Sequence, residues 1–445
     1  MGRPSKTRQL DIWMNGELVG HWTVKSQGQH ELAYESTWLE SSSARPLSLS
    51  LPLQEAKVPH RGAAVAYFFD NLLPDSLPIR RRLRDRFGAP TINAFDLLSE
   101  IGRDCVGAIQ LAPHGDVPPD VRHIEGEPLT EVDVARVLRH TAHAPALGQQ
   151  EEEGSRISIA GAQEKTALLW HDGQWRRPTG ATPTTHILKL PLGLVGNMKA
   201  DLTTSVENEW LSMTIARGYG LTTADCEMAT FEDQHALVVR RFDRRRATRG
   251  AEWWIRLPQE DFCQATKTPA DQKYERDGGP GIVDIMDILR NSRTPDQDRL
   301  TFFKCQVLFW LLAAPDGHAK NFSIFIEPAG RYRLTPLYDI LSAHPLMGKG
   351  GNQIAPQNLK LAMALRGKNR QHNWATIQLR HWLGTAKACG LAEDVTLAII
   401  TEMVEATPGV VDEAATLLPP GFPAPVADSI LSGITRGASS LAQLL

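Results

Sequence analysis

The sequence has few of the features that mark membrane, secreted or metal-structured proteins. Its 445 residues include only five cysteines, and none of these has the short spacing of a zinc-binding or redox pair. The most apolar run, residues 307–314, is far shorter than the roughly 20 residues that span a membrane. The first residues are basic, but no apolar signal-peptide segment follows them. We therefore expect a cytosolic protein with buried thiols and no membrane partner.

An excess of charge of one sign is also missing. The 48 Lys and Arg residues nearly balance the 51 Asp and Glu residues, which gives a formal net charge of −3. This balance excludes a global attraction to nucleic acid or to a membrane, so any such contact must be local. The arginine-rich run at 80–84 is typical of a solvated helix face, with a nucleic-acid patch as the alternative.

The chain is long enough for two or three domains, because 42% of its residues are hydrophobic and can fill large cores. Residues 1–145 combine helices with short strands, among them an Asn15-Gly16 hairpin and a period-two run at 46–53. An acidic, polar linker at 148–154 marks the boundary to a second, strand-rich part that ends near residue 245.

Residues 246–445 are mostly helical, with helices expected at 282–289, 300–314, 374–389, 392–405 and 426–444. The predicted fold is therefore α+β and bilobal. Its N-terminal part is β-rich, residues 146–245 form the nucleotide-binding portion, and the C-terminal lobe is mostly helical.

A short polar loop at 313–322 carries the most informative residues. Asp316 and Asn321 lie five residues apart, and a second lone carboxylate, Asp339, follows a strand-like run. In protein kinases an Asp of the catalytic loop accepts the proton of the substrate hydroxyl, an Asn at this interval holds magnesium, and a later Asp holds magnesium at the phosphates. The alternative is a polar turn that caps a helix, because Asp, Gly and Asn are common turn residues.

Segments upstream of this loop offer a phosphate-binding counterpart. Residues 158–167 place small residues between two β-prone runs, which would let backbone N–H groups approach phosphates, although an ordinary hairpin is the alternative. Lys189 lies in an apolar strand, where a kinase carries its phosphate-pairing lysine and where other proteins carry an edge lysine. Of the glutamates in the next helix, Glu207 and Glu209, only one can reach Lys189, and we favour Glu209.

The strand at 235–239 leads into a charged connector, as the hinge between kinase lobes does, and Phe242 could pack there against an adenine. A strand that ends in a solvated basic turn is the alternative. The order of these segments, from small-residue loop to strand lysine, helix glutamate, hinge and Asp-x-x-x-x-Asn, is that of a kinase. The sequence therefore predicts an ATP-dependent phosphotransferase.

Blocks along nearly the whole chain are similar to one known family. They are residues 44–53, 69–76, 97–104, 158–167, 257–261, 273–275, 277–281, 316–322 and 334–340. From these blocks the chain is identified as a member of the HipA serine/threonine-protein kinase toxins of bacterial type II toxin–antitoxin systems.

The resemblance implies roles for individual residues, with ATP and Mg²⁺ as cofactors. Asp316 is the catalytic base, Asn321 and Asp339 are the magnesium ligands, and Ser158 is an autophosphorylation site that switches the kinase off, although it could also be a plain strand residue. A phosphoserine adds about 1.5–2 negative charges, which would repel nucleotide phosphates. The implied ATP-binding residues are Ala160, Gly161, Ala162, Gln163, Glu164, Lys165, Lys189, Arg240, Arg241, Phe242, His318, Lys320, Asn321 and Tyr338.

The resemblance also implies partners. These are a small helix-turn-helix antitoxin that recognises operator DNA and inactivates the kinase, and a protein substrate such as an aminoacyl-tRNA synthetase. Two residues depart from the family pattern: Arg240 replaces a hinge glutamate, and Lys387 alone remains of a DNA-contacting basic pair. The sequence has no helix-turn-helix signature, so it would read operator DNA only through the antitoxin. The competing function is an antitoxin-dependent corepressor with little kinase activity.

Overall fold

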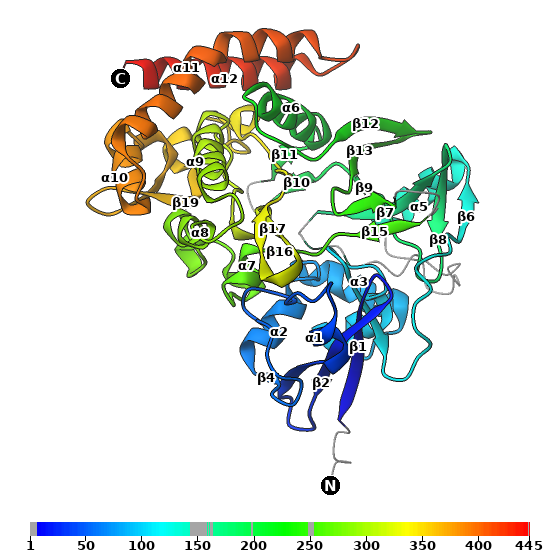
Figure 1. The fold of residues 1–445 in the computed structure, drawn as a ribbon. Coiled ribbons are helices and arrows are strands. Elements are labelled where there is room, and N and C mark those ends of the chain that lie inside the picture. Colours follow the sequence, from blue (N-terminus) through cyan, green and yellow to red (C-terminus); the bar gives the residue numbers. More distant parts are fainter. Residues whose placement is uncertain are drawn as a thin grey trace.

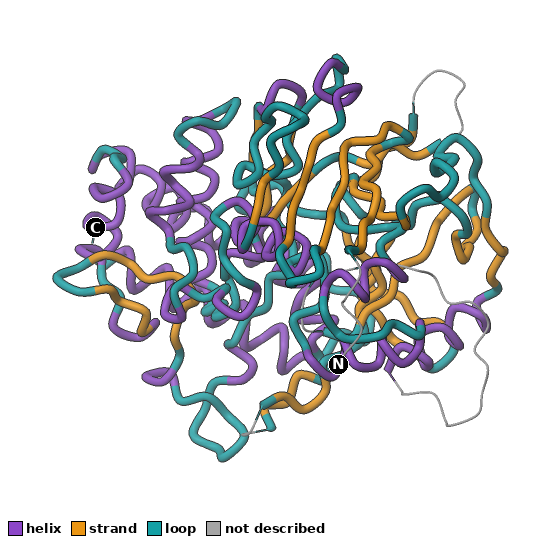
Figure 2. Tube along the Cα trace, turned by 90° about the horizontal axis from the view of Figure 1, so that it is seen from below, coloured by secondary structure: helices purple, strands orange, loops and turns teal. Residues whose placement is uncertain are grey.

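The structure, a computed structural model, describes residues 7–142, 158, 160, 163–196, 199–247, 253–443 and 445. Strands dominate the N-terminal part, and Figure 2 shows that most helices lie on the side of the C-terminus. This arrangement confirms the predicted α+β fold with a β-rich N-terminal part and a helical C-terminal lobe. In the described part of the chain, no helix combines the length and the apolar character that a membrane crossing requires.

The chain begins with a five-stranded antiparallel sheet (Figure 1). Its strand order is β4-β3-β2-β1-β5, with β1 Arg8–Met14, β2 Glu17–Val24, β3 His30–Tyr34, β4 His60–Arg61 and β5 Ile109–Pro113. The predicted hairpin is confirmed, because β1 and β2 pair across Asn15 and Gly16, whose φ angles of 50° and 88° suit a tight hairpin turn.

Four helices pack against this sheet and its loops: α1 Ser36–Glu40, α2 Ala63–Asp70, α3 Leu77–Phe87 and α4 Ala94–Ile101. Leu10, Ile12 and Trp22 are buried in the core they form, where Trp22 stacks on Phe69 with ring centroids 3.9 Å apart. Side chains alternate between the two faces of a strand. Asp11, which pairs with the β2 residue across from it, therefore projects from the other face of the sheet.

A six-stranded sheet follows, in the order β12-β13-β9-β7-β8-β6. Its strands are β6 Gly126–Leu129, β7 Lys165–His171, β8 Gln174–Pro178, β9 His186–Lys189, β12 Cys226–Phe231 and β13 Gln234–Arg240. Helix α5 (Glu131–Ala142) packs on it through a shared apolar core, and α6 (Ser205–Gly218) packs against β12 and β13. Strand β6 lies in this sheet and α5 packs on it, so both elements lie with the second part of the chain.

Short strand pairs connect the sheets to the C-terminal lobe. They are β10 Gly193–Val195 with β11 Ala200–Leu202, β14 Arg244–Arg246 with β15 Trp254–Arg256, the trio β16 Gln259–Asp261, β17 Ser323–Ile326 and β18 Tyr332–Leu334, and β19 Lys360–Arg366 with β20 Arg370–Asn373. The helices of this lobe are α7 Phe262–Ala265, α8 Ile282–Leu289, α9 Pro295–Leu311, α10 Leu379–Cys389, α11 Glu393–Thr416 and α12 Ala424–Ala442. They build the largest apolar core of the described chain.

Several predicted elements differ from those observed. Residues 46–53 form no regular strand, only an isolated bridge, because the serines of the alternating pattern are buried and Ser48 bonds Ser50 at 2.8 Å. Helix α11 continues to Thr416, since Pro408 is accommodated inside it. In the run at 80–84, Arg80 is buried and lies 2.6 Å from Asp70, so this face of α3 is only partly solvated. All five cysteines are free thiols; four are buried and Cys226 is half-buried.

Candidate active site

One pocket gathers most of the predicted site residues at the junction of the three parts of the chain. The predicted residues that line it are Ala160, Gln163, Lys165, Lys189, Arg240, Arg241, Phe242, Asp316, His318, Lys320, Asn321, Tyr338 and Asp339. Gly161 and Ala162 lie outside the described residues. Four other predicted residues, Ser158, Glu164, Glu209 and Lys387, do not line the pocket.

Lys189 is the electrostatic centre of this pocket. It ends β9, which lies between β7 and β13 and is therefore not an edge strand. Its Nζ lies 2.6 Å from Glu209 Oε1 on α6 and 2.9 Å from Asp339 Oδ1. Burial opposes the lysine charge, but these two carboxylates outweigh burial and raise the pKa of Lys189. The structure thus places Glu209 against Lys189, whereas Glu207 lies 3.2 Å from His235.

A Glu209→Gln variant is expected to lower phosphoryl transfer about 10–100-fold, the usual cost of losing a residue that orients a ligand. Without the glutamate, Lys189 has Asp339 as its remaining carboxylate and competes with a metal ion for it. The Mg²⁺ concentration that gives half-maximal activity should rise accordingly. Glu207→Gln, two residues before Glu209 in α6, is the matched control and should leave this concentration unchanged. Equal effects of both changes would contradict the assigned role of Glu209.

The catalytic loop is tied to Asp339 through Asn321. A 3-10 turn at Ala319–Asn321 brings Asn321 Nδ2 to 2.7 Å from Asp316 O and 3.4 Å from Asp339 O. Asp339 has a φ of 60°, an uncommon value for a residue with a side chain and one that often occurs at functional sites. Gly317 is required next to Asp316, because a Cβ there would lie 2.1 Å from the ring of Phe309.

The two predicted metal ligands have the chemistry that magnesium prefers. Mg²⁺ binds oxygen donors, chiefly carboxylates, and keeps several waters. The Asn321 amide donates inward through Nδ2, which leaves Oδ1 as its acceptor. Burial alone would raise the pKa of Asp339, but Lys189 and Lys165 hold it well below its ordinary value, so the carboxylate is charged. Asn321 and Asp339 therefore fit a magnesium ion.

Asp316 is the accessible carboxylate of the pocket, since 47% of its side chain is exposed. The Tyr274 hydroxyl donates a hydrogen bond to Asp316 Oδ1, and His318 Nε2 lies 3.6 Å from the same oxygen. Burial and the charge of Asp316 raise the pKa of Tyr274, so it stays protonated as a donor. Our site prediction from sequence missed Tyr274. In the sequence, Tyr274 is marked only by its position in the family-like block 273–275, and that position does not indicate a chemical role.

Lys320 is held by a carboxylate from the N-terminal part of the chain. Its Nζ lies 2.7 Å from Asp75 Oδ1, and Lys273 Nζ lies 2.9 Å from Asp75 Oδ2. Burial would raise the pKa of Asp75, but the two lysines hold it far below its ordinary value. Burial lowers the pKa of a third lysine of the pocket, Lys165, to about 8. Our site prediction also missed Asp75, because it lies after α2, 245 residues before Lys320 in the chain.

The three predicted hinge residues, Arg240, Arg241 and Phe242, all line the pocket, but their side chains differ in what they offer to a ligand. The Arg241 guanidinium points into a buried network, with Nη2 2.8 Å from Asp243 and Nη1 3.3 Å from Asp104, so its side chain is engaged and not available to a nucleotide. Arg240 is exposed, and its closest carboxylate is Asp225 at 3.8 Å. Phe242 is the hinge residue with an apolar surface at the pocket, and its ring lies 5.7 Å from that of Tyr338.

The remaining predicted residues lie around the pocket or away from it. Ser158 is buried, its N–H donates to Asp104 O at 3.2 Å, and its hydroxyl donates to Leu72 O at 2.7 Å. Glu164 pairs with Arg82 of α3. Lys387 is exposed in the last turn of α10 and has no part in the pocket.

Comparison with known proteins reveals the relationships of the chain. Residues 10–112 match the HipA N-terminal domain, and residues 157–411 match the HipA-like C-terminal domain. "Putative kinase Y4mE" of Sinorhizobium fredii is 33% identical over 404 residues, which cover 90% of each chain. The serine/threonine-protein kinase toxin HipA of Shewanella oneidensis is 26% identical over 434 residues, 94% of this chain and 91% of that one.

A solved structure shares the fold over the full length. It is the complex of Shewanella oneidensis HipA with HipB and operator DNA, which matches with a TM-score of 0.80 and 22% identity and covers 98% of each chain. At this identity, the match supports the fold and does not transfer roles to individual residues.

Proposed function

Because the chain belongs to the HipA family of serine/threonine-protein kinase toxins, we propose that its pocket transfers the γ-phosphoryl group of ATP to a serine or threonine of another protein. One observation carries this proposal. Lys189, bound to both Glu209 and Asp339, lies in the same pocket as the accessible carboxylate of Asp316. Protein kinases use such a set to hold phosphates, position a metal ion and receive the proton of the substrate.

Each residue then has one task. Asp316 accepts the proton of the attacking hydroxyl, because its carboxylate lines the pocket, is 47% exposed and lies 3.6 Å from His318. Lys189 holds the α- and β-phosphates, with Glu209 fixing its position. Phe242 and Tyr338 offer aromatic surface for the adenine. Asn321 and Asp339 would hold magnesium, which supplies charge neutralisation at the phosphates when bound.

The test is transfer of label from γ-labelled ATP, with Mg²⁺, to proteins of a cell extract. The expected result is acid-stable label on serine or threonine that depends on the added protein and disappears with the Asp339→Asn variant. If ATP binds but no label is transferred by the wild type, the kinase proposal is wrong and the corepressor function remains.

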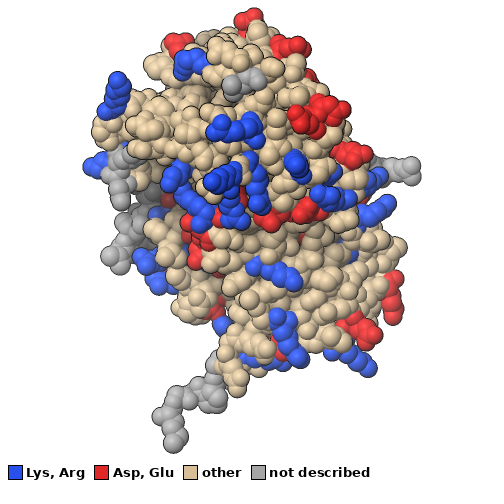
Figure 3. Space-filling view, turned by 90° about the vertical axis from the view of Figure 1, so that its left-hand side faces the viewer, with Lys and Arg blue, Asp and Glu red and all other residues tan. Residues whose placement is uncertain are grey.

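For partners, the proposal extends to a small helix-turn-helix antitoxin, to operator DNA through that antitoxin, and to a cytoplasmic translation component such as an aminoacyl-tRNA synthetase as substrate. The HipA relative of known structure forms a complex with HipB and operator DNA, which supports the first two partners. On the face drawn in Figure 3, Lys and Arg side chains gather across the middle, with Asp and Glu among them, despite the net charge of −3. Such local clustering favours contact with a polyanion, and exposed Lys387 is the residue proposed to touch DNA.

We also propose that Ser158 is the regulatory autophosphorylation site. Incubation with MgATP is expected to add one phosphate at Ser158 and to weaken ATP binding more than about tenfold, because phosphoserine brings roughly 1.5–2 negative charges toward the phosphate site. Since the hydroxyl is buried against Leu72 O, this reaction requires the segment to leave its position first. Ser158→Ala should stay unmodified and active, as mass spectrometry and repeated activity measurements can show. Ser48→Ala, which also removes a buried serine hydroxyl, is the control and should still be inactivated by MgATP.

A further inference from the structure

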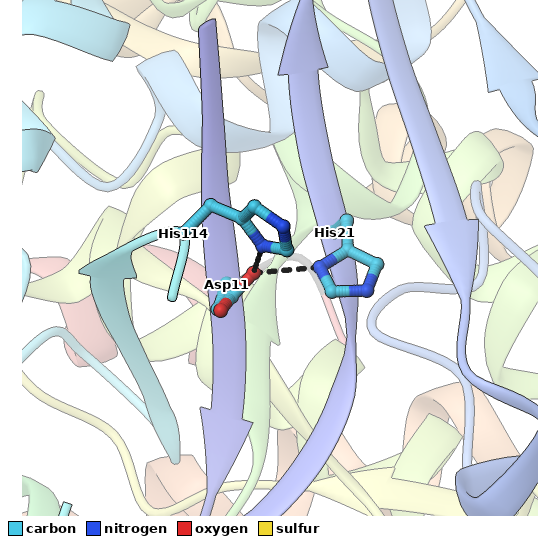
Figure 4. A group of neighbouring side chains, drawn as sticks. All are labelled: Asp11, His21 and His114. Atoms are coloured by element: carbon cyan, nitrogen blue, oxygen red, sulfur yellow. Dashed lines mark hydrogen bonds and ion pairs between the residues drawn. The ribbon is translucent and has the colours of Figure 1, made fainter. Parts of the chain in front are cut away.

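A second group of chemically active side chains lies outside the pocket, on the face of the first sheet that points away from its helices. Figure 4 shows that Asp11 on β1, His21 on β2 and His114 just after β5 converge there on one point. Asp11 and His21 are direct partners across the two strands. Their ligand atoms and that of His114 all lie within 4.8 Å of one another.

Each ring nitrogen of His21 lies at hydrogen-bond distance from a carboxylate oxygen, which requires either two N–H donors or a bound metal ion. His21 Nδ1 lies 2.7 Å from Asp11 Oδ1, and His21 Nε2 lies 2.6 Å from Glu35 Oε1. Carboxylate oxygens only accept hydrogen bonds, and a neutral imidazole has one donor and one acceptor nitrogen. A neutral His21 would therefore hold a nitrogen lone pair against a carboxylate. Either His21 is an imidazolium, or one nitrogen binds a cation in place of a proton.

His114 brings a second imidazole to the same oxygen. Its Nδ1 lies 2.7 Å from Asp11 Oδ1 and 3.3 Å from Gln9 Nε2. One carboxylate oxygen and two imidazole nitrogens, all atoms that commonly bind transition metals, therefore face one another. A metal ion shared by the three atoms would satisfy both imidazoles at once, whereas without an ion each Nδ1 must carry a hydrogen toward Asp11.

We propose that Asp11, His21 and His114 form a binding site for a divalent transition-metal ion such as zinc. Two imidazoles and one carboxylate are the three protein ligands of many such sites, with an open position left for water or another donor. Glu35 completes the arrangement by accepting from Nε2 of His21, as the outer carboxylate of a carboxylate–histidine–metal triad does. This site is independent of the proposed kinase function.

The surroundings suit an ion of this kind. Asp11 is 5% exposed, while 19% of the His21 side chain and 56% of the His114 side chain are exposed, so the open position faces solvent. Ligands at a tetrahedral zinc ion lie about 3.3 Å apart. Small rotations of the two rings would open the 2.7 Å contacts to that spacing.

The test is titration of chelator-treated full-length protein with Co²⁺, whose visible absorption reports histidine coordination, followed by displacement with Zn²⁺. We expect one site per chain that Zn²⁺ empties of Co²⁺. Asp11→Asn and His114→Gln should each weaken it at least about tenfold. The control His123→Gln, which removes an exposed histidine that pairs with Asp120 at 2.5 Å, should bind as the wild type does.

Circular dichroism and thermal unfolding of the metal-free proteins verify that each variant folds. The proposal is overturned if folded wild-type protein gives no Co²⁺ absorption, or if His114→Gln binds as tightly as the wild type. A ¹⁵N spectrum that shows both nitrogens of His21 protonated in the presence of stoichiometric Zn²⁺ would also overturn it, since His21 would then be an imidazolium.

Discussion

An Asp316→Asn variant is expected to bind ATP like the wild type and to transfer phosphoryl about 10²–10⁴-fold more slowly, the usual contribution of a general base. The change keeps the shape of the side chain. It also keeps the backbone oxygen to which Asn321 Nδ2 donates at 2.7 Å, so the proposed metal ligands stay in place. What disappears is the carboxylate proposed to take the proton of the substrate hydroxyl. The loss should therefore fall on the chemical step.

Single-turnover rates at saturating ATP measure that step, and a fluorescent nucleotide measures binding. Asp277→Asn is the matched control, because this acid lies three residues after Tyr274 and 47% of its side chain is exposed. It should change neither quantity. A rate that falls less than tenfold in Asp316→Asn, with ATP binding preserved, would show that Asp316 is not the base.

The largest expected effect on stability comes from Asp104→Asn. Asp104 is buried and accepts hydrogen bonds from Arg244 at 2.8 Å, Arg256 at 3.1 Å and Arg241 at 3.3 Å. Removing its charge leaves three buried guanidinium groups with Asp243 as the carboxylate that remains. Breaking a buried ion pair on one side costs about 3–5 kcal/mol of the free energy of unfolding.

Urea unfolding followed by tryptophan fluorescence measures this loss as a lower midpoint with an unchanged slope. Asp116→Asn is the control, since it breaks an Asp–Arg pair of 3.1 Å on the surface, where such pairs contribute about 0–1 kcal/mol. Burial would raise the pKa of Asp104, but the three arginines hold it far below its ordinary value. Its stabilisation is therefore fully present above the ordinary carboxyl pKa and is lost progressively as the pH falls from that value toward the lowered pKa. Equal midpoints for both variants at pH 7 would contradict the assigned role.

Sequence reasoning reaches furthest where residues lie close together in the chain. The interval from Asp316 to Asn321 is set within one loop, and helix geometry allows only one of Glu207 and Glu209 to reach Lys189. The structure then shows that Glu209 is the one in contact with Lys189. The hairpin could be predicted for the same reason, because two adjacent residues, Asn15 and Gly16, form its turn.

Contacts between distant segments could not be predicted in this way. The bond from Tyr274 to Asp316 and the network around Arg241 depend on how separate elements pack, and no residue pattern states which arginine will turn inward. The run at 46–53 was misjudged for a related reason. Its alternating serines are typical of a half-exposed strand, yet Ser48 and Ser50 are buried like their neighbours Leu47 and Leu51.

The two salt bridges of Asp75 link the N-terminal part of the chain to the net charge of the pocket. With Asp75 in place, Lys273, Lys320 and this carboxylate together carry one positive charge. Without this carboxylate the two lysines alone would carry two positive charges, so a residue of the N-terminal part of the chain sets how strongly the pocket attracts an anion.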